Sequence, residues 1–223
     1  MTARVGVVVF PGTNCEHDVV RSVRSVGAEA ELVWGGQSQL GAVDAVVIPG
    51  GFAHGDYLRP GAIARISPIM AAVAAFAAEG GPVVGICNGF QVLTEAGLLP
   101  GALQRNAGLR FLCDTVSVTV CSDSSVLTRG AEPGSQLQLP VNHYEGRYVA
   151  DVDTVRRLRE EDRVVLRYVS NPNGSVDDIA GVTSEGRNVV GLMPHPERAC
   201  DALLGSTDGA VLLRSLVDSE LAG

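Results

Sequence analysis

Cys87 is the side chain in this 223-residue sequence best placed to act as a nucleophile. It stands in the segment Gly85 to Gly89, read Gly-Ile-Cys-Asn-Gly, directly after an apolar run. Glycines on both sides allow a tight, strained turn from a strand into a helix, which presents a nucleophile at the helix N-terminus. The partial positive charge of that terminus favours a thiolate. A small buried core cysteine is the alternative, but the glycine frame favours the nucleophile.

His195 and Glu197 form a second chemical pair, in the segment Pro-His-Pro-Glu at 194–197. A thiolate in acyl transfer needs an acid–base partner that is held in one tautomer. The flanking prolines favour extended backbone, in which residues two apart point to the same side, so Glu197 could orient the imidazole. A helix that begins at Pro196, with Glu197 in its first turn, is the alternative. Together with the cysteine frame, the segment indicates a Cys–His–Glu triad.

Consecutive glycines follow a third apolar run, in the segment Pro-Gly-Gly at 49–51. Backbone N–H groups of such a turn can face outward and bind a developing oxyanion. The amide of Gly51 and the amide of Asn88, just after the cysteine, are the predicted donors. An ordinary glycine turn is the alternative interpretation.

These segments require a scaffold that brings them to one place, and the alternation of apolar patterns predicts it. Strands separated by helices indicate a mostly parallel sheet with helices on both faces, whose ligands gather at the carboxyl ends of the strands. The expected strands are 4–10, 31–34, 43–48, 82–86 and 188–193, and the expected helices are 14–26, 62–79, 88–96 and 208–220.

The middle of the chain has a different pattern. Segments 110–120 and 164–170 are rich in β-branched residues and alternate in polarity, which predicts antiparallel strands beside the parallel sheet. No internal repeat and no long linker divides the chain. We therefore expect one α/β domain over residues 1–223.

The composition excludes several function classes. All 17 basic residues are arginine, so a Walker-A phosphate loop and a lysine Schiff base are ruled out. A hydrophobic fraction of 46% indicates a packed globular protein. The net charge of −8, without a basic tract, argues against nucleic acid or an anionic membrane as the main partner.

The cysteines and the apolar runs indicate the cellular compartment of the protein and whether it binds a metal. We expect neither a signal peptide nor a membrane span, because no apolar run approaches about 20 residues. An odd number of cysteines without a C-x-x-C pair predicts reduced thiols, no metal site and a cytoplasmic protein. Cys15 receives no chemical role, and the remaining cysteines are expected to be structural, namely Cys113, Cys121 and Cys200.

The three chemical segments together resemble the triad-type (class I) glutamine amidotransferase family, through residues 47–51, 85–91 and 194–197. Four further stretches resemble one branch of that family, the small glutaminase subunits of phosphoribosylformylglycinamidine synthases. They are residues 10–15, 50–59, 171–175 and 191–198. The resemblance runs almost from end to end and implies a flavodoxin-like fold.

The resemblance implies a role for each residue of the three segments. Cys87 would attack the side-chain amide of glutamine, while the amides of Gly51 and Asn88 hold the oxyanion. His195 would protonate the departing ammonia and then activate water, and Glu197 would orient His195.

The resemblance also implies a glutamine pocket. Gln91, by its place in the nucleophile motif, is expected to line this pocket. His143 and Tyr144, within the loop 142–146, are expected to approach the bound glutamine. The family usually has Ser-Tyr where this chain has Ala53 and His54, and we interpret His54 as a loop variant rather than a second base.

In this family the ammonia passes to a larger synthetase subunit that uses ATP and magnesium to convert formylglycinamide ribonucleotide, and a small accessory subunit completes the complex. The resemblance implies no cofactor in this chain. Two alternatives stay open. A stand-alone cysteine hydrolase or stress protein of the related superfamily would generally lack His-Pro-Glu. A non-catalytic regulator would not need an intact triad.

Overall fold

Five parallel strands form one half of a nine-stranded sheet in this computed structural model, which describes residues 2–221. The continuous apolar runs of the central strands are buried on both faces, as expected where helices cover a parallel sheet on each side. In spatial order the five strands are β2 (Glu29–Trp34), β1 (Arg4–Val9), β3 (Ala45–Ile48), β4 (Val83–Ile86) and β11 (Val189–Leu192).

Four antiparallel strands continue the same sheet beyond β11. In spatial order they are β10 (Ile179–Thr183), β9 (Val164–Tyr168), β6 (Leu112–Val120) and β7 (Gln136–His143). A separate small sheet pairs β5 (Ala102–Gln104) with β8 (Arg147–Val149). The predicted α/β class with an added antiparallel region is confirmed, and β11 is the strand that joins the two halves.

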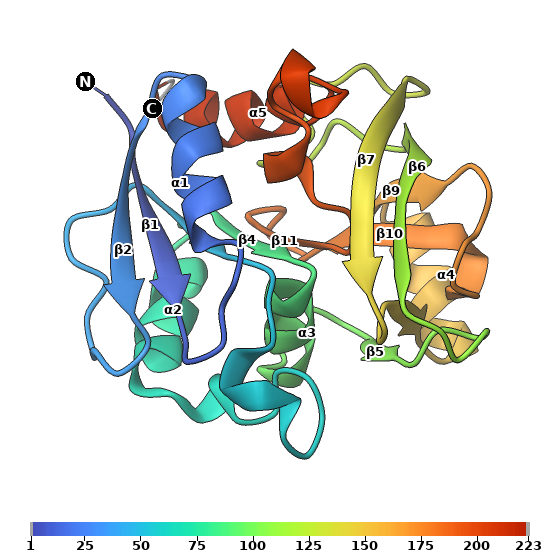
Figure 1. Ribbon diagram of the computed structural model, residues 1–223, viewed down its shortest axis with the longest axis horizontal. Helices are drawn as coiled ribbons and strands as arrows, with labels where there is room; N and C mark the ends of the chain where they lie inside the picture. Colours follow the sequence, from blue (N-terminus) through green and yellow to red (C-terminus); the bar gives the residue numbers. More distant parts are fainter. Residues whose placement is uncertain (1, 222–223) are drawn as a thin grey trace.

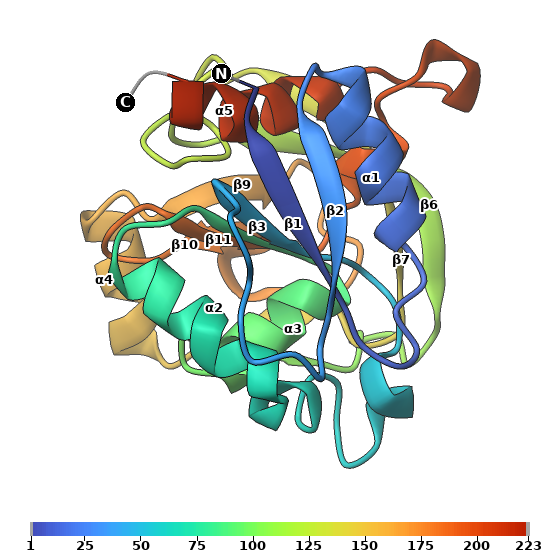
Figure 2. The same cartoon turned by 90° about the vertical axis from the view of Figure 1, so that its left-hand side faces the viewer.

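Helices cover both faces of the parallel half. Figure 1 shows α1 (Glu16–Ser25) and α5 (Gly209–Leu221) on one face. Helices α2 (Pro68–Ala78) and α3 (Asn88–Glu95) lie on the other face, and Figure 2 shows the same layers from the side. Helix α4 (Val152–Glu160) lies beside the antiparallel half. Short 3-10 turns cover Ala53–Asp56, Ala64–Ile66, Val176–Asp178, Pro196–Arg198 and Ala202–Leu204.

The expected helix over 62–79 is wrong as one element. It is divided into a 3-10 turn, Ala64–Ile66, and α2. Ser67 between them is extended, with φ −64° and ψ 144°. The residue before a proline is disfavoured in the helical region, so Pro68 begins a new helix rather than continuing the old one.

Several elements have no counterpart in the sequence prediction, namely β5, β7, β8, β10 and α4. Strand β7 contains Pro140, which argues against a central strand, and β7 indeed lies at the edge of the sheet. Helix α4 is polar on most sides, but Asp151 caps it by accepting from the Thr154 amide at 2.8 Å. Neither element shows a long apolar pattern that sequence alone would reveal.

The fold brings the three chemical segments to one edge. Strands β3, β4 and β11 are parallel neighbours, so the segments that follow them meet at the same edge of the sheet. Within residues 2–221, no helix is both long and apolar enough to span a membrane.

Candidate active site

Cys87 occupies the sharp turn between β4 and α3. Its backbone has φ +52° and ψ −102°, a strained conformation for a residue with a side chain. A Cβ atom at Gly89 would lie 1.9 Å from the carbonyl oxygen of Ile48, so only glycine fits there. The Cys87 amide donates to the Leu192 carbonyl at 2.8 Å and ties the turn to β11. The cysteine therefore stands in the elbow that its glycine frame predicts.

The segment after β11 brings an imidazole and a carboxylate together. Oε1 of Glu197 lies 2.6 Å from Nδ1 of His195, and both side chains are buried. Because a carboxylate accepts hydrogen bonds, Nδ1 carries the proton of this contact. The His195 amide donates to the Pro140 carbonyl at 2.8 Å, so the edge strand β7 fixes the backbone of the pair.

Cys87 and His195 line one cavity with a volume of about 1210 Å³. Burial alone would lower the pKa of His195, but the Glu197 carboxylate and the nearby sulfur of Cys87 raise it well above its ordinary value of 6.5. An imidazolium beside a thiol favours the thiolate, which is the nucleophilic form. Nε2 of His195 has no hydrogen-bond partner in the described part of the chain. The arrangement can support nucleophilic attack followed by proton transfer.

Gly51 lies in a loop that packs tightly against the segment before α1. Its φ is +150°, and a Cβ atom there would lie 2.6 Å from the amide nitrogen of Asn14. Gly51 lines the cavity together with Cys87. The amide of Asn88 stands in the first turn of α3, where N–H groups have no partner within the helix. This placement is compatible with the oxyanion role, which stays a prediction.

The buried side chain of Asn88 links the loop after β3 to α3. Its Oδ1 accepts from the Ala53 amide at 3.0 Å. Its Nδ2 donates to Oε1 of Gln91 at 2.8 Å and to Oδ1 of Asp56 at 3.3 Å. The bonds to Ala53 and Asp56 fix the predicted oxyanion loop relative to the helix that follows the nucleophile, and the bond to Gln91 lies within that helix.

His54 belongs to a run of left-handed residues in that loop, from 54 to 56. Its Nε2 lies 3.4 Å from Oγ of Ser67, and its ring lies 5.9 Å from the ring of Phe10. His54 is not among the residues that line the cavity. Its position therefore agrees with a loop variant and not with a second base.

The three residues assigned to the glutamine pocket, Gln91, His143 and Tyr144, all line the cavity. Nε2 of Gln91 donates to the carbonyl of Glu145 at 2.6 Å, so this amide holds the loop after β7. The Tyr144 ring lies 6.0 Å from the guanidinium carbon of Arg105. The structure thus places all three at the cavity, and their contact with a substrate stays a prediction.

His143 is a buried neutral imidazole. Its Nδ1 lies 3.1 Å from Oδ1 of Asn106, an oxygen that also accepts from the Gly146 amide at 3.1 Å. Burial and the neighbouring His195 lower the pKa of His143 to about 4. Nε2 has no partner within the described residues and therefore offers a lone pair in the cavity wall.

Three polar side chains of the site have no role assigned by sequence reasoning: Cys15, Asp56 and Arg198. Each lines the cavity. Burial and the charge of Glu145 raise the pKa of Asp56 to about 6. The one signal that could have found them is their position inside the family-like stretches 10–15, 50–59 and 191–198.

Cys15, His195 and Glu197 offer possible metal ligands within 4.8 Å of one another. However, Nη2 of Arg198 donates to the Cys15 sulfur at 3.0 Å. A guanidinium at that distance repels a cation, and Nδ1 of His195 is already paired with Glu197. We assign no metal to this cluster.

The sequence profile described as a CobB/CobQ-like glutamine amidotransferase domain matches residues 2–209. Phosphoribosylformylglycinamidine synthase subunit PurQ of Rubrobacter xylanophilus is 60% identical, over 96% of this chain and 97% of the relative. The chain belongs to this glutamine amidotransferase family. PurQ of Lacticaseibacillus paracasei is 54% identical, over 96% of this chain and 95% of that protein.

A solved structure supports the same assignment. The structure of PurLQS from Thermotoga maritima contains a chain that matches with a TM-score of 0.91 and 41% identity, over 98% of this chain and 99% of that chain. The resemblance inferred from the short motifs is therefore confirmed. The chain is a glutamine amidotransferase of the PurQ family, whose members are subunits of an enzyme complex.

Proposed function

We propose that this chain hydrolyses L-glutamine through a Cys87 thioester and passes the ammonia to a synthetase subunit. That subunit would convert formylglycinamide ribonucleotide to formylglycinamidine ribonucleotide in de novo purine biosynthesis. The observation that carries the proposal is the cavity in which the cysteine elbow meets the His195–Glu197 pair. We place ATP and magnesium on the synthetase subunit, expect a small accessory subunit, and expect the complex to be cytoplasmic.

The first half of the reaction forms the thioester. The Cys87 sulfur attacks the amide carbon of glutamine, and the oxyanion accepts hydrogen bonds from the backbone amides of Gly51 and Asn88. His195 gives its Nε2 proton to the amide nitrogen as the C–N bond breaks. Ammonia leaves, and the glutamyl group stays on the sulfur.

The second half releases glutamate. His195, now neutral, takes a proton from water while the water oxygen attacks the thioester carbon. The C–S bond breaks, and the proton returns the Cys87–His195 pair to its starting state. Glu197 holds Nδ1 throughout, so Nε2 stays directed at the reacting atoms. The sum is one glutamine and one water converted to glutamate and ammonia.

Asp56 is expected to bind the α-ammonium group of glutamine, because its carboxylate lines the cavity beside the nucleophile helix. With the pKa of Asp56 raised to about 6, the KM for glutamine should rise as the pH falls below that value and the carboxylate is protonated. Asp56→Asn should raise KM about tenfold, change kcat less than about twofold and remove this pH dependence. Steady-state kinetics from pH 5 to 8 measure it, with the exposed Asp123→Asn as control. An unchanged KM would contradict the assignment.

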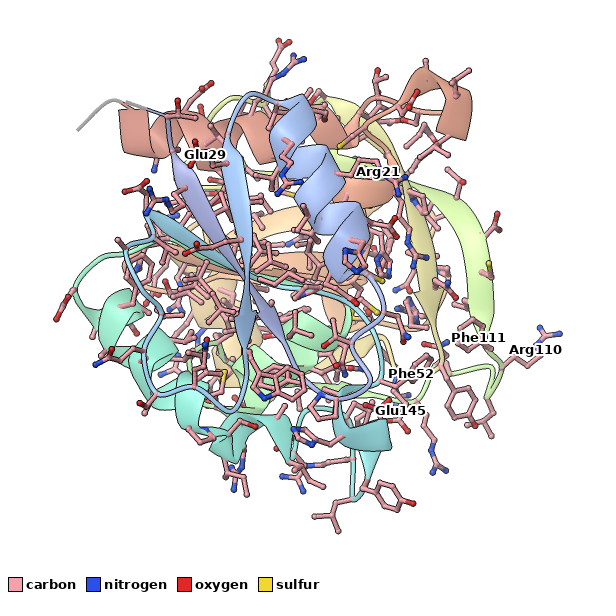
Figure 3. The ribbon with its side chains drawn as sticks, turned by 60° about the vertical axis from the view of Figure 1, so that its left-hand side comes forward. Arg21, Glu29, Phe52, Arg110, Phe111 and Glu145 are labelled. Atoms are coloured by element: carbon pink, nitrogen blue, oxygen red, sulfur yellow. The ribbon has the colours of Figure 1, made fainter. Side chains whose placement is uncertain are left out.

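The cavity is lined by several exposed apolar side chains, which supports a subunit that docks over it. One of them is Leu58, which is 88% exposed and lines the cavity. Its neighbour in the sequence, Tyr57, is 74% exposed. The other exposed apolar side chains that line the cavity are Phe52, Leu109 and Phe111. Figure 3 shows Phe52 and Phe111 close to Glu145 at this cavity. A group of exposed apolar side chains at one cavity is typical of an interaction site.

Leu58→Asp should weaken binding of the synthetase subunit at least about tenfold, because it puts a charge in place of the most exposed apolar side chain of the cavity lining. Aspartate tolerates the left-handed backbone at this position, where φ is +70°. Leu203→Asp is the matched control, since Leu203 is 93% exposed and is not among the residues that line the cavity. Calorimetric titration of each variant measures the affinity. Equal affinities for both variants would argue against docking over the cavity.

The proposed function is tested with the purified chain and its synthetase partner. The isolated chain should hydrolyse glutamine slowly, and the partner should stimulate hydrolysis and couple it to ATP-dependent synthesis. Rapid hydrolysis by the isolated chain, unaffected by the partner, would favour the stand-alone hydrolase instead.

A further inference from the structure

Cys15 is a buried thiol that the proposed reaction does not use. It is the residue before the first turn of α1, and only 2% of its surface is exposed. Its amide donates to the carbonyl of Gly50 at 3.1 Å, which fixes it to the loop that carries Gly51. A small cysteine in a core needs no polar contacts, but this one has them.

The sulfur of Cys15 lies between a cation and the catalytic imidazole. Nη2 of Arg198 donates to it at 3.0 Å. On the other side, the sulfur, a ring nitrogen of His195 and a carboxylate oxygen of Glu197 lie within 4.8 Å of one another. The sulfur is therefore an acceptor beside the Glu197 contact of the imidazole.

Gly50 shows how closely these groups pack. A Cβ atom at this position would lie 2.7 Å from Cε1 of His195, 3.4 Å from its Nδ1 and 3.2 Å from the Cys15 sulfur. The absence of a side chain at Gly50 lets the backbone of the loop contact both the ring and the thiol. The imidazole is thus confined by Gly50, Cys15 and Glu197.

We propose that Cys15 is a positioning residue for His195: its sulfur, held by Arg198, supports the Nδ1 side of the imidazole together with Glu197. Cys15 does not touch the substrate carbon in this scheme. It keeps Nε2 directed at Cys87 and stabilises the imidazolium that gives its proton to ammonia. The activity assays that test this proposal rest on the proposed glutaminase function.

The charged and titratable groups around His195 come from every element packed on it. They are Glu197, Arg198 and Cys200 on its own segment, Cys15 and Asp18 at α1, Cys87 at the nucleophile turn, and His143 at the end of β7. Among them, the contact with Cys15 acts to raise the pKa of His195. Removing the sulfur should therefore lower that pKa, and the alkaline limb of the activity profile should move to lower pH.

The test uses the full chain in complex with its synthetase partner. Cys15→Ala should lower glutamine-dependent kcat about tenfold, leave KM within about twofold and move the alkaline limb down by about half a pH unit. Cys15→Ser, which keeps a polar acceptor, should recover part of both effects. Ammonia-dependent synthesis should be unchanged, and the exposed Cys113→Ala is the control.

A second measurement does not depend on glutamine. The rate at which iodoacetamide alkylates Cys87, followed by peptide mass spectrometry against pH, reports the Cys87–His195 pair directly. Cys15→Ala should shift the onset of this profile to higher pH, because a less basic imidazole stabilises the Cys87 thiolate less. If that variant is unstable, Cys15→Ser decides by a smaller shift in the same direction. Profiles identical to wild type would overturn the positioning role and leave the glutaminase proposal intact. A shifted alkylation profile in a chain without glutaminase activity would support the positioning role and contradict the glutaminase proposal.

Discussion

Cys87→Ala should abolish glutamine-dependent synthesis by the complex, by at least about a thousandfold, while synthesis from added ammonia continues. The sulfur supplies the bond to the glutamyl group, and no other thiol in the described chain stands at the elbow between β4 and α3. Ammonia bypasses that step because it reaches the synthetase directly. Parallel assays with glutamine and with ammonium chloride measure the two activities.

The control for this experiment is Cys113→Ala, because that thiol is exposed on β6 and lies outside the cavity lining. It should keep both activities. Removal of a sulfur from a buried turn could also disturb the fold, so the ammonia-dependent rate serves as an internal measure of an intact complex. Equal loss of both activities in Cys87→Ala would show that the cysteine is structural.

His195→Ala should reduce glutamine-dependent kcat by about a thousandfold or more, and Glu197→Ala by a smaller factor of about ten to a hundred. Without the imidazole, neither the departing ammonia nor the attacking water has a partner for proton transfer. Without the carboxylate, the ring keeps its proton-transfer atoms but loses the 2.6 Å contact that orients it. Steady-state kinetics of both variants in the complex measure the order.

Glu185→Gln is the matched control for the carboxylate, because its side chain is 88% exposed and does not line the cavity. It should behave as wild type. A larger loss in Glu197→Ala than in His195→Ala would reverse the assigned roles and make the carboxylate the principal proton-transfer group.

The meeting of Cys87, His195 and Gly51 at one cavity could be predicted because their signals are local. The glycines around Cys87 and the prolines around His195 each restrict the backbone within a few residues, and the order of strands places those turns at one edge. The same reasoning predicted the parallel half of the sheet, since most of its strands are short apolar runs with glycine or proline close by in the sequence.

The other features of the site and of the fold depend on contacts between residues far apart in the sequence, and such contacts leave no local pattern. Cys15 is one residue in a polar segment, and its importance rests on Arg198, which lies far along the chain. Pro140 reads as a strand breaker, yet its carbonyl receives the His195 amide because β7 has a free edge. The break before Pro68 is the opposite case. The rule that the residue before a proline disfavours helix could have predicted it, but the continuous apolar pattern over 62–79 indicated one helix.

The position of β11 affects how the protein can be made. This strand comes from the last part of the chain but lies between β4 and β10, so it closes a gap in the middle of the sheet. During synthesis on the ribosome, the parallel and antiparallel portions are therefore two unconnected sheets until residues 189–192 have emerged. A chain truncated before them would expose two open edges, which are sites of aggregation, and would carry the thiol without its imidazole.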